Sequence, residues 1–129
     1  MRDLANNIGI VNAISPQTLT AYTESEHIDL QGFESLTFSI HAGADVGSAQ
    51  FTAEVQHSDT SDSMDFEAVP VTDLISSGTY PTILTNDIHK VGYIGDKRYV
   101  RIVFNYDSGT SLQLAALAIK GHAHDRPVA

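Results

Sequence analysis

The chain of 129 residues contains no cysteine and no tryptophan. Without cysteine it can form neither a disulfide framework nor a thiolate metal site, and this composition suits synthesis in the cytoplasm. Without tryptophan it lacks the largest of the aromatic faces on which sugar-binding platforms depend. The sequence therefore excludes disulfides and thiolate metal sites as means of stabilising a small domain, and it weakens the case for a sugar-binding function.

Basic residues are scarce. Seven lysines and arginines stand against sixteen acidic residues, which gives a formal net charge of -9 and a pI of about 4.8. Proteins that bind nucleic acid normally carry a basic patch, and docking on anionic lipid also requires positive charge. We therefore expect no nucleic-acid partner and no membrane partner.

Long apolar runs are also missing. Residues 1–7 are too polar for the apolar core of a signal peptide, and no run approaches the roughly 20 residues that span a bilayer. The length is that of one domain that can build a core without covalent staples. We expect a soluble, single-domain protein over residues 1–129.

What the sequence does contain is alternation with a period of two. Residues 35–41 place Leu36, Phe38 and Ile40 on one face, and residues 51–56 repeat the pattern from Phe51 to Val55. A half-buried antiparallel strand has this pattern, with one face on the core and the other in water. The pattern predicts that the following residues are buried: Leu36, Phe38, Ile40, Phe51, Val55, Val100, Ile102 and Phe104.

Further strands are predicted over residues 8–14, 27–30, 88–94, 99–106 and 112–120. The first should end at Ser15-Pro16, and residues 66–71 should form an edge strand because of Pro70. Residues 112–119 also have helical propensity, but their position after a turn favours a buried strand. Residues 71–76 are expected to form at most one helical turn, with Thr72 and Asp73 as caps. Eight or so strands predict an all-β fold, a single antiparallel β-sandwich that resembles a jelly roll.

Turn sequences join several of these strands. Residues 41–48 are rich in glycine, residues 107–110 read Asp-Ser-Gly-Thr, and Gly95-Asp96 lies inside the segment 91–101. Each is typical of a short connection between paired strands, and Gly95-Asp96 is expected to supply unusual backbone angles. The sequence therefore predicts three β-hairpins.

Candidate metal ligands are present but poorly arranged. Residues 58–65 contain three aspartates, without the ligand order, central glycine or final glutamate of a calcium loop. His122 and His124 share one face of an extended chain, yet zinc needs at least a third ligand. The simpler interpretations are a solvated turn and a surface pair, so we expect no metal and no cofactor.

Nor does a catalytic arrangement appear. No serine lies in a nucleophile elbow, and Gly92 to Gly95 belong to a strand and turn instead of opening a helix around phosphate. Lys97, Arg98 and Arg101 form the basic cluster of the chain, which either pairs with carboxylates on nearby strands or contacts an acidic partner. We expect that the protein is not an enzyme.

Three stretches resemble small virion proteins of tailed phages that are encoded near the major capsid gene. They are residues 56–69, which run from Gln-His-Ser-Asp to Asp-Phe-Glu-Ala-Val, residues 91–101, and residues 121–128. Together they span most of the chain from residue 35 onward. The resemblance is to the family of capsid decoration (cement) or minor capsid proteins.

That resemblance implies a β-rich homotrimer on the outer surface of the virion head, made in the bacterial cytoplasm, which bridges subunits of the major capsid protein. Residues 1–7 would be an N-terminal arm and residues 121–129 a C-terminal tail, because neither shows strand alternation, and chain ends of this kind are usually disordered when free. The candidate capsid contacts are Arg2, Asp3, Leu4, Lys97, Arg98, Arg101 and Arg126.

The sequence is also compatible with other positions in a virion. β-Sandwiches also serve as head-tail joining proteins and as carbohydrate- or receptor-binding modules of tails. Exposed tyrosines at positions 22, 80 and 93 would favour the binding module.

Overall fold

The computed structural model describes residues 1–75, 81–125, 127 and 128. Six long strands are β1 (Gly9–Leu19), β4 (Ser35–Val46), β5 (Gln50–Ser58), β9 (Ile88–Tyr93), β10 (Tyr99–Ser108) and β11 (Ser111–Gly121). Five two-residue strands are β2 (Thr23–Glu24), β3 (Ile28–Asp29), β6 (Glu67–Ala68), β7 (Leu74–Ile75) and β8 (Thr82–Ile83). The helical elements of the described residues are the single 3₁₀ turns η1 (Ala5–Asn7), η2 (Ser63–Asp65) and η3 (Val71–Asp73), none of them near the length of a membrane-spanning helix.

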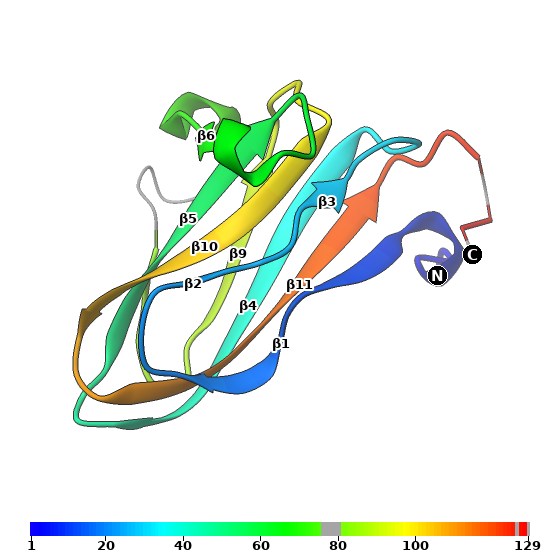
Figure 1. Cartoon of the computed structure of the whole chain (residues 1–129). Coiled ribbons are helices and arrows are strands. Elements are labelled where there is room, and N and C mark those ends of the chain that lie inside the picture. Colours follow the sequence, from blue (N-terminus) through cyan, green and yellow to red (C-terminus); the bar gives the residue numbers. More distant parts are fainter. Residues whose placement is uncertain (76–80, 126, 129) are drawn as a thin grey trace.

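The strands form two antiparallel sheets that pack face to face (Figure 1). Sheet A has the order β1-β11-β4-β9-β7, and sheet B has the order β2-β10-β5-β6, with β3 also paired to β10 and β8 to β5. If β2 and β3 are taken as one broken strand, and β6 and β8 as another, this is the strand order of an eight-stranded jelly roll with an extra edge strand, β7. The predicted all-β sandwich is confirmed.

The three predicted hairpins are wrong. The connections after β4, β9 and β10 each carry the chain from one sheet to the other, so the strands on either side of them do not pair. A turn sequence shows that the chain reverses direction, but it does not show whether the next strand lies beside the first or across the core from it. At one end of the sandwich two such corners touch, because the Thr110 amide donates to the Val46 carbonyl over 3.0 Å.

The core between the sheets agrees with the predicted faces. All eight residues expected to be buried are at most 2% exposed. Strand β4 places Phe38 and Ile40 on the core from sheet A, and β10 places Ile102 and Phe104 on it from sheet B. Residues 112–119 lie within β11 and not in a helix. Period-two alternation was sufficient to assign the inner face of every long strand it covered.

Strand β1 extends beyond its predicted end and runs through Pro16 to Leu19. It is an edge strand, so the missing amide hydrogen of Pro16 need not break a ladder on its outer side. The register with β11 shifts between Asn12 and Ile14 and again between Ile14 and Gln17, which marks two bulges around the proline. Strand β4 is also longer than predicted and includes residues 42–46 of the expected loop.

The segment 66–71 forms less strand than its sequence predicts. Only Glu67 and Ala68 belong to β6, at the edge of sheet B as expected, while Pro70 precedes the 3₁₀ turn η3. That turn falls where one helical turn was predicted, but it has no side-chain cap from Thr72 or Asp73. Pro70 is the cap position itself, since its fixed φ angle suits the residue before a helical turn.

The chain ends lie close together, as Figure 1 shows. The Val128 amide donates to the Asn6 carbonyl over 2.8 Å, and the His124 amide donates to the Gly32 carbonyl over 2.9 Å. The expected free arms therefore have contacts with the rest of the chain in this structure. Backbone hydrogen bonds between distant segments leave no signature in local alternation, which is why the sequence did not predict them.

Truncation of a core phenylalanine should test the assignment of the two faces. We expect Phe38→Ala and Phe104→Ala each to lower the free energy of unfolding by roughly 3–5 kcal/mol, because each leaves a cavity in the core. Leu117→Ala, on the outer face of β11, is the control and should cost less than about 1 kcal/mol. The measurement is urea unfolding, and unchanged midpoints for both phenylalanine variants would show that the faces are reversed.

Candidate functional site

The corner between β9 and β10, residues 94–98, is the most elaborate connection in the structure. Its Gly95 does not have the left-handed backbone that the sequence suggested, because the described glycines with positive φ are Gly32, Gly47 and Gly109. A Cβ at Gly95 would instead lie 2.5 Å from the Tyr93 hydroxyl oxygen. Gly95 is therefore required for close approach to the Tyr93 ring, and not for its backbone angles.

Tyr93 links the two sheets at this corner. It belongs to sheet A, is 4% exposed, and lies edge-on to the ring of His57 from sheet B. The Lys97 amide donates to the Tyr93 hydroxyl over 3.1 Å, and the same hydroxyl shares a hydrogen bond of 2.9 Å with His57 Nδ1. Burial raises the pKa of Tyr93 above its ordinary value, so the phenol keeps its hydrogen at neutral pH.

Two residues of the predicted basic cluster hold the same corner in place. Lys97 Nζ lies 2.8 Å from Asp59 Oδ2, in the loop that precedes η2. Arg98 donates from Nε and Nη2 to the two carboxylate oxygens of Asp29 in β3, over 2.9 Å each, and from Nη2 to Gln31 over 2.7 Å. A bidentate pair of this kind fixes orientation as well as distance. The corner is thereby fastened to β3 of sheet B and to the loop that follows β5.

Arg101, the third basic residue, is 8% exposed. Its Nε donates to Gln56 Oε1 over 2.8 Å, its Nη1 lies 3.5 Å from Glu24 Oε2, and its guanidinium lies 4.6 Å from the centre of the Phe66 ring. The simpler interpretation of the cluster, pairing with carboxylates and amides across strands, describes what all three residues do here. Arg101 in particular leaves almost no surface for a partner.

The ion pairs shift the pKa values of their members in the directions expected for opposite charges. The hydrogen bonds from Arg98 lower the pKa of Asp29 against the opposing effect of its burial. The hydrogen bond with Asp59 raises the pKa of Lys97. Both shifts favour the charged forms that make the contacts.

The candidate metal ligands make hydrogen bonds and ion pairs within the chain. The Asp62 side chain caps η2 by accepting from the Met64 amide, and Asp65 accepts from the Thr60 hydroxyl over 2.7 Å. At the C-terminus, His122 Nδ1 lies 2.9 Å from Ser35 Oγ, and His124 Nε2 lies 3.5 Å from Glu34. Across residues 1–75, 81–125, 127 and 128, no group of three potential ligands converges.

The candidate contacts at the ends of the chain have different surroundings. Leu4 is 67% exposed and Arg2 is exposed as well, whereas Asp3 accepts hydrogen bonds from Asn6 that lower its pKa. Arg126 lies outside the described residues. Arg2, Asp3 and Leu4 are all exposed and thus form a group separate from the basic cluster of Lys97, Arg98 and Arg101.

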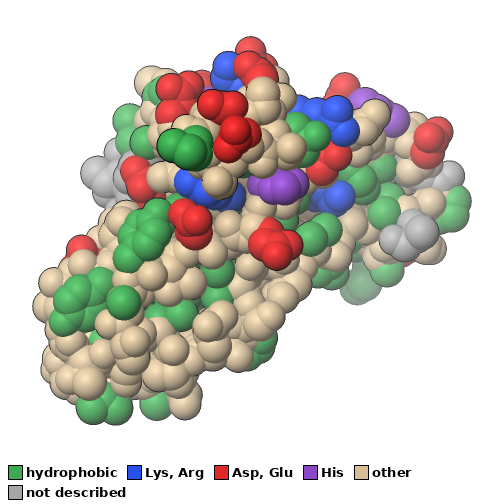
Figure 2. Space-filling model, in the orientation of Figure 1, with side chains coloured by type: hydrophobic (Ala, Val, Ile, Leu, Met, Phe, Trp, Pro, Cys, Tyr) green, Lys and Arg blue, Asp and Glu red, His purple; other side chains and the backbone are tan. Residues whose placement is uncertain are grey.

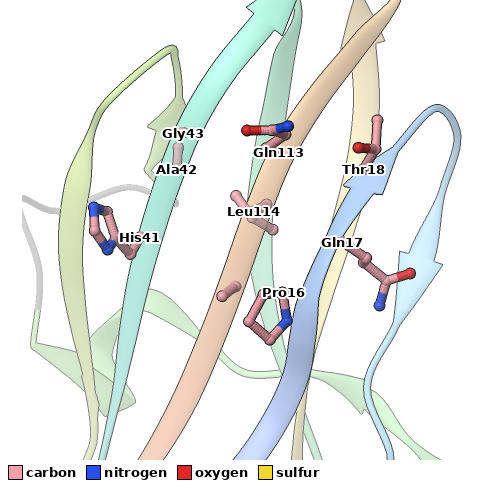
Figure 3. A pocket seen from close by; sticks show the side chains of 9 residues that line it. Pro16, Gln17, Thr18, His41, Ala42, Gly43, Gln113 and Leu114 are labelled. Atoms are coloured by element: carbon pink, nitrogen blue, oxygen red, sulfur yellow. The ribbon is translucent and has the colours of Figure 1, made fainter.

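A groove of about 510 Å³ lies on the outer side of sheet A, lined by residues of β1, β11 and β4 (Figure 3). It adjoins the bulge at Pro16, where β1 departs from regular pairing, and the small residues Gly43 and Ala115 keep it open. Its polar side chains include Gln17, His41 and Gln113. The lining residues carry no carboxylate, serine or cysteine, and the polar groups of the groove are side-chain amides, the Thr18 hydroxyl and the His41 ring.

Charged side chains gather toward one end of the molecule. Figure 2 shows them mostly at the end where β6 lies, while the opposite end of that face is nearly free of charge. The tyrosines expected to be exposed differ in position. Tyr22 is 52% exposed, Tyr93 is buried, and Tyr80 lies outside the described residues. Of the three tyrosines named for a sugar-binding module, Tyr22 is therefore the one that the described structure exposes, and Tyr106 is 45% exposed as well.

Sequence reasoning missed the Tyr93–His57 contact and the groove. The pair joins residues 36 positions apart, and the groove depends on three strands from distant parts of the chain. The signal available for the groove was Pro16 in a β-branched segment, which was interpreted as a strand end instead of a bulge.

The fold defines an all-β jelly roll, and comparison with solved structures agrees. The PBSX exported protein XepA matches with a TM-score of 0.59 and 14% identity over 100% of this chain and 41% of that chain. A chain in the structure of the infectious bursal disease virus Gx strain matches with a TM-score of 0.50 and 10% identity over 93% of this chain and 34% of that one.

The SPBc2 prophage-derived protein YomS matches with a TM-score of 0.48 and 14% identity over 92% of this chain and 98% of that chain. Our chain spans about two fifths of the XepA chain. No family model and no curated protein matches the sequence. At these identities the likeness establishes the fold alone.

The contribution of the Tyr93 hydroxyl to stability can be measured by removing its oxygen atom. We expect Tyr93→Phe to lower the free energy of unfolding by about 1–3 kcal/mol, because buried His57 and the Lys97 amide both lose a partner. The control, Tyr22→Phe, removes an exposed hydroxyl and should change it by about 0.5 kcal/mol or less. If the two variants have equal effects in urea unfolding, the buried hydrogen bonds of Tyr93 do not contribute to stability.

The Asp29–Arg98 pair should make stability depend on pH. Because pairing lowers the folded-state pKa of Asp29, its contribution is present above the ordinary value of ~3.9 and is lost as the pH falls through the folded-state pKa. Asp29→Asn should therefore destabilise the protein near neutral pH and have little effect in strong acid. In an Arg98→Gln background, the effect of Asp29→Asn on stability should depend much less on pH. If that effect still varies with pH as before, Arg98 is not the cause of the pH dependence.

Proposed function

We propose that the protein is a structural component of a tailed-phage virion that decorates the outside of the head and bridges major capsid subunits. The observation that carries the proposal is the jelly-roll strand order, because that architecture is used mainly in viral capsid domains, lectins and cupins. The three stretches that resemble phage decoration proteins select the first of these uses. XepA, described as a PBSX exported protein, and the infectious bursal disease virus chain support it through their fold.

The chemistry of the described residues is consistent with a structural role. The basic cluster is used to fasten a corner of the sandwich, where Lys97 pairs with Asp59, and Asp62 and Asp65 are used in local hydrogen bonds. Sugar recognition, the alternative for a jelly roll, has less support because Tyr93 is buried. On this proposal the protein is not an enzyme, and the homotrimer implied by the resemblance stays a prediction.

Contact with the capsid is assigned to the N-terminal residues. Arg2 and Leu4 are exposed, whereas Lys97, Arg98 and Arg101 are already paired within the chain. Strand β1 follows at once and has a free outer edge, so a segment of a capsid subunit can add to it as a further strand. The arm and this edge together form a continuous candidate surface.

The copy number in the virion tests the general proposal. Quantitative mass spectrometry of purified particles of the encoding phage should find roughly hundreds of copies, since a decoration protein follows the repeats of the shell. A handful of copies per particle would instead indicate a tail tip or a head-tail joint, and absence from the particle would reject a virion role.

Removal of residues 1–4 should test the assigned contact. The deletion keeps the Asn6 carbonyl that accepts from Val128, so the sandwich should retain its urea midpoint. Binding to heads that lack the protein should weaken. Leu4→Asp should weaken it too, while Met64→Asp, the same change at another exposed apolar residue, should not. Undiminished binding of the truncated chain at the same salt concentration would refute the arm contact.

A further inference from the structure

The outer face of sheet A differs in chemistry from the rest of the surface. The pairing register aligns side chains that point away from the core into rows across the strands. One row contains Ile10, Ile119, Thr37, Gly92 and Ile75, the next contains Asn12, Leu117, Ser39 and Lys90, and a third contains Ala115, His41 and Ile88. We call these three rows the A face.

Apolar side chains on the A face are open to solvent. Ile10 is 61% exposed, Ile75 63%, Ile88 72% and Leu117 42%. The corresponding face of sheet B is partly covered by the chain itself, since Phe66 packs on Arg101 and lies near His27. The described part of the chain thus partly covers the outer face of sheet B and leaves the apolar residues of the A face exposed.

The A face is also free of carboxylates in a chain that has sixteen acidic residues. Its formal charge comes from Lys90 alone. On sheet B, by contrast, Glu24 and Glu54 flank Val103 on the outer side. Two copies that approach by sheet B bring carboxylates together, whereas two copies that approach by the A face do not. The charge distribution therefore allows an acidic chain to meet another copy of itself through this face, where the exposed apolar side chains also gather.

We propose that two copies of the chain associate through their A faces. Five strands about 4.8 Å apart, with roughly seven residues along β11, give a face of roughly 500 Å² per copy. Two such faces bury roughly 1,000 Å², the lower end of specific interfaces, so the pair is weak and depends on protein concentration. A single self-complementary patch closes as a two-fold pair. The trimer implied by the resemblance would need a different contact, and this inference does not rest on the proposed function.

Sedimentation of the purified full chain over a range of protein and salt concentrations tests the pair. We expect a monomer–dimer equilibrium that tightens as salt rises, because salt screens the net repulsion while an apolar contact does not weaken. Association through the basic residues would show the opposite salt dependence. A protein that stays monomeric at every concentration and salt level would overturn the proposal.

Matched variants locate the contact. Ser39→Asp places a carboxylate at the centre of the A face and should weaken dimerisation roughly tenfold or more, since like charges then oppose each other. Asn105→Asp, the same kind of change on the outer side of β10, should leave it unchanged. Leu117→Ser removes apolar contact without adding charge and keeps the test decisive if Ser39→Asp fails to fold, as judged by its urea midpoint.

Three outcomes would contradict the assignment. Equal weakening by Ser39→Asp and Asn105→Asp would mean that added charge acts through overall repulsion. A trimer whose mass is insensitive to both A-face variants would place the contact elsewhere. A monomer whose binding to phage heads is abolished by Ser39→Asp would show that the capsid, and not a second copy, covers the A face.

Discussion

The apolar layer between the two sheets is the constraint on which the rest of the structure depends. From β4 onward, successive long strands lie in opposite sheets, so each corner between them must carry the chain across a core about 10 Å thick. Backbone groups in such corners cannot pair with a neighbouring strand, and polar groups nearby must satisfy them. The Tyr93 hydroxyl accepts from Lys97 in one corner, and Asp45 accepts from the Ala49 amide in another. Tyr93, which the sequence offered as a residue of a binding module, is thus used to satisfy the backbone of a corner.

Local alternation predicted the inner faces of the long strands because burial of one face imposes a period of two on each strand separately. It contains no information on which strand lies beside which. The pairs β1–β11 and β4–β11 join segments that are far apart in the chain, and each depends on the whole fold. For the same reason the turn sequences were recognised correctly as reversals and interpreted wrongly as hairpins.

The candidate site was also predictable only in part: the sequence identified its basic residues but not the residues that pair with them. The cluster of Lys97, Arg98 and Arg101 is visible in the sequence, and pairing with carboxylates across strands was one of its two interpretations. The partners were not predictable, since Asp59 and Asp29 lie 38 and 69 residues away. Likewise Ile10 and Ile75 appear unrelated in the sequence, and only the register of five strands places them on one face.

The position of β11 has a consequence for how the protein is made. This strand lies in the interior of sheet A, between β1 and β4, so the sheet cannot close until residues 111–121 have been synthesised. Until then the nascent chain holds two unpaired strand edges, which are the surfaces by which β proteins aggregate. A chain that is truncated before residue 111 lacks an interior strand of sheet A and not an edge strand. Closure of sheet A over the core therefore depends on β11, the strand that is synthesised after all its neighbours in the sheet.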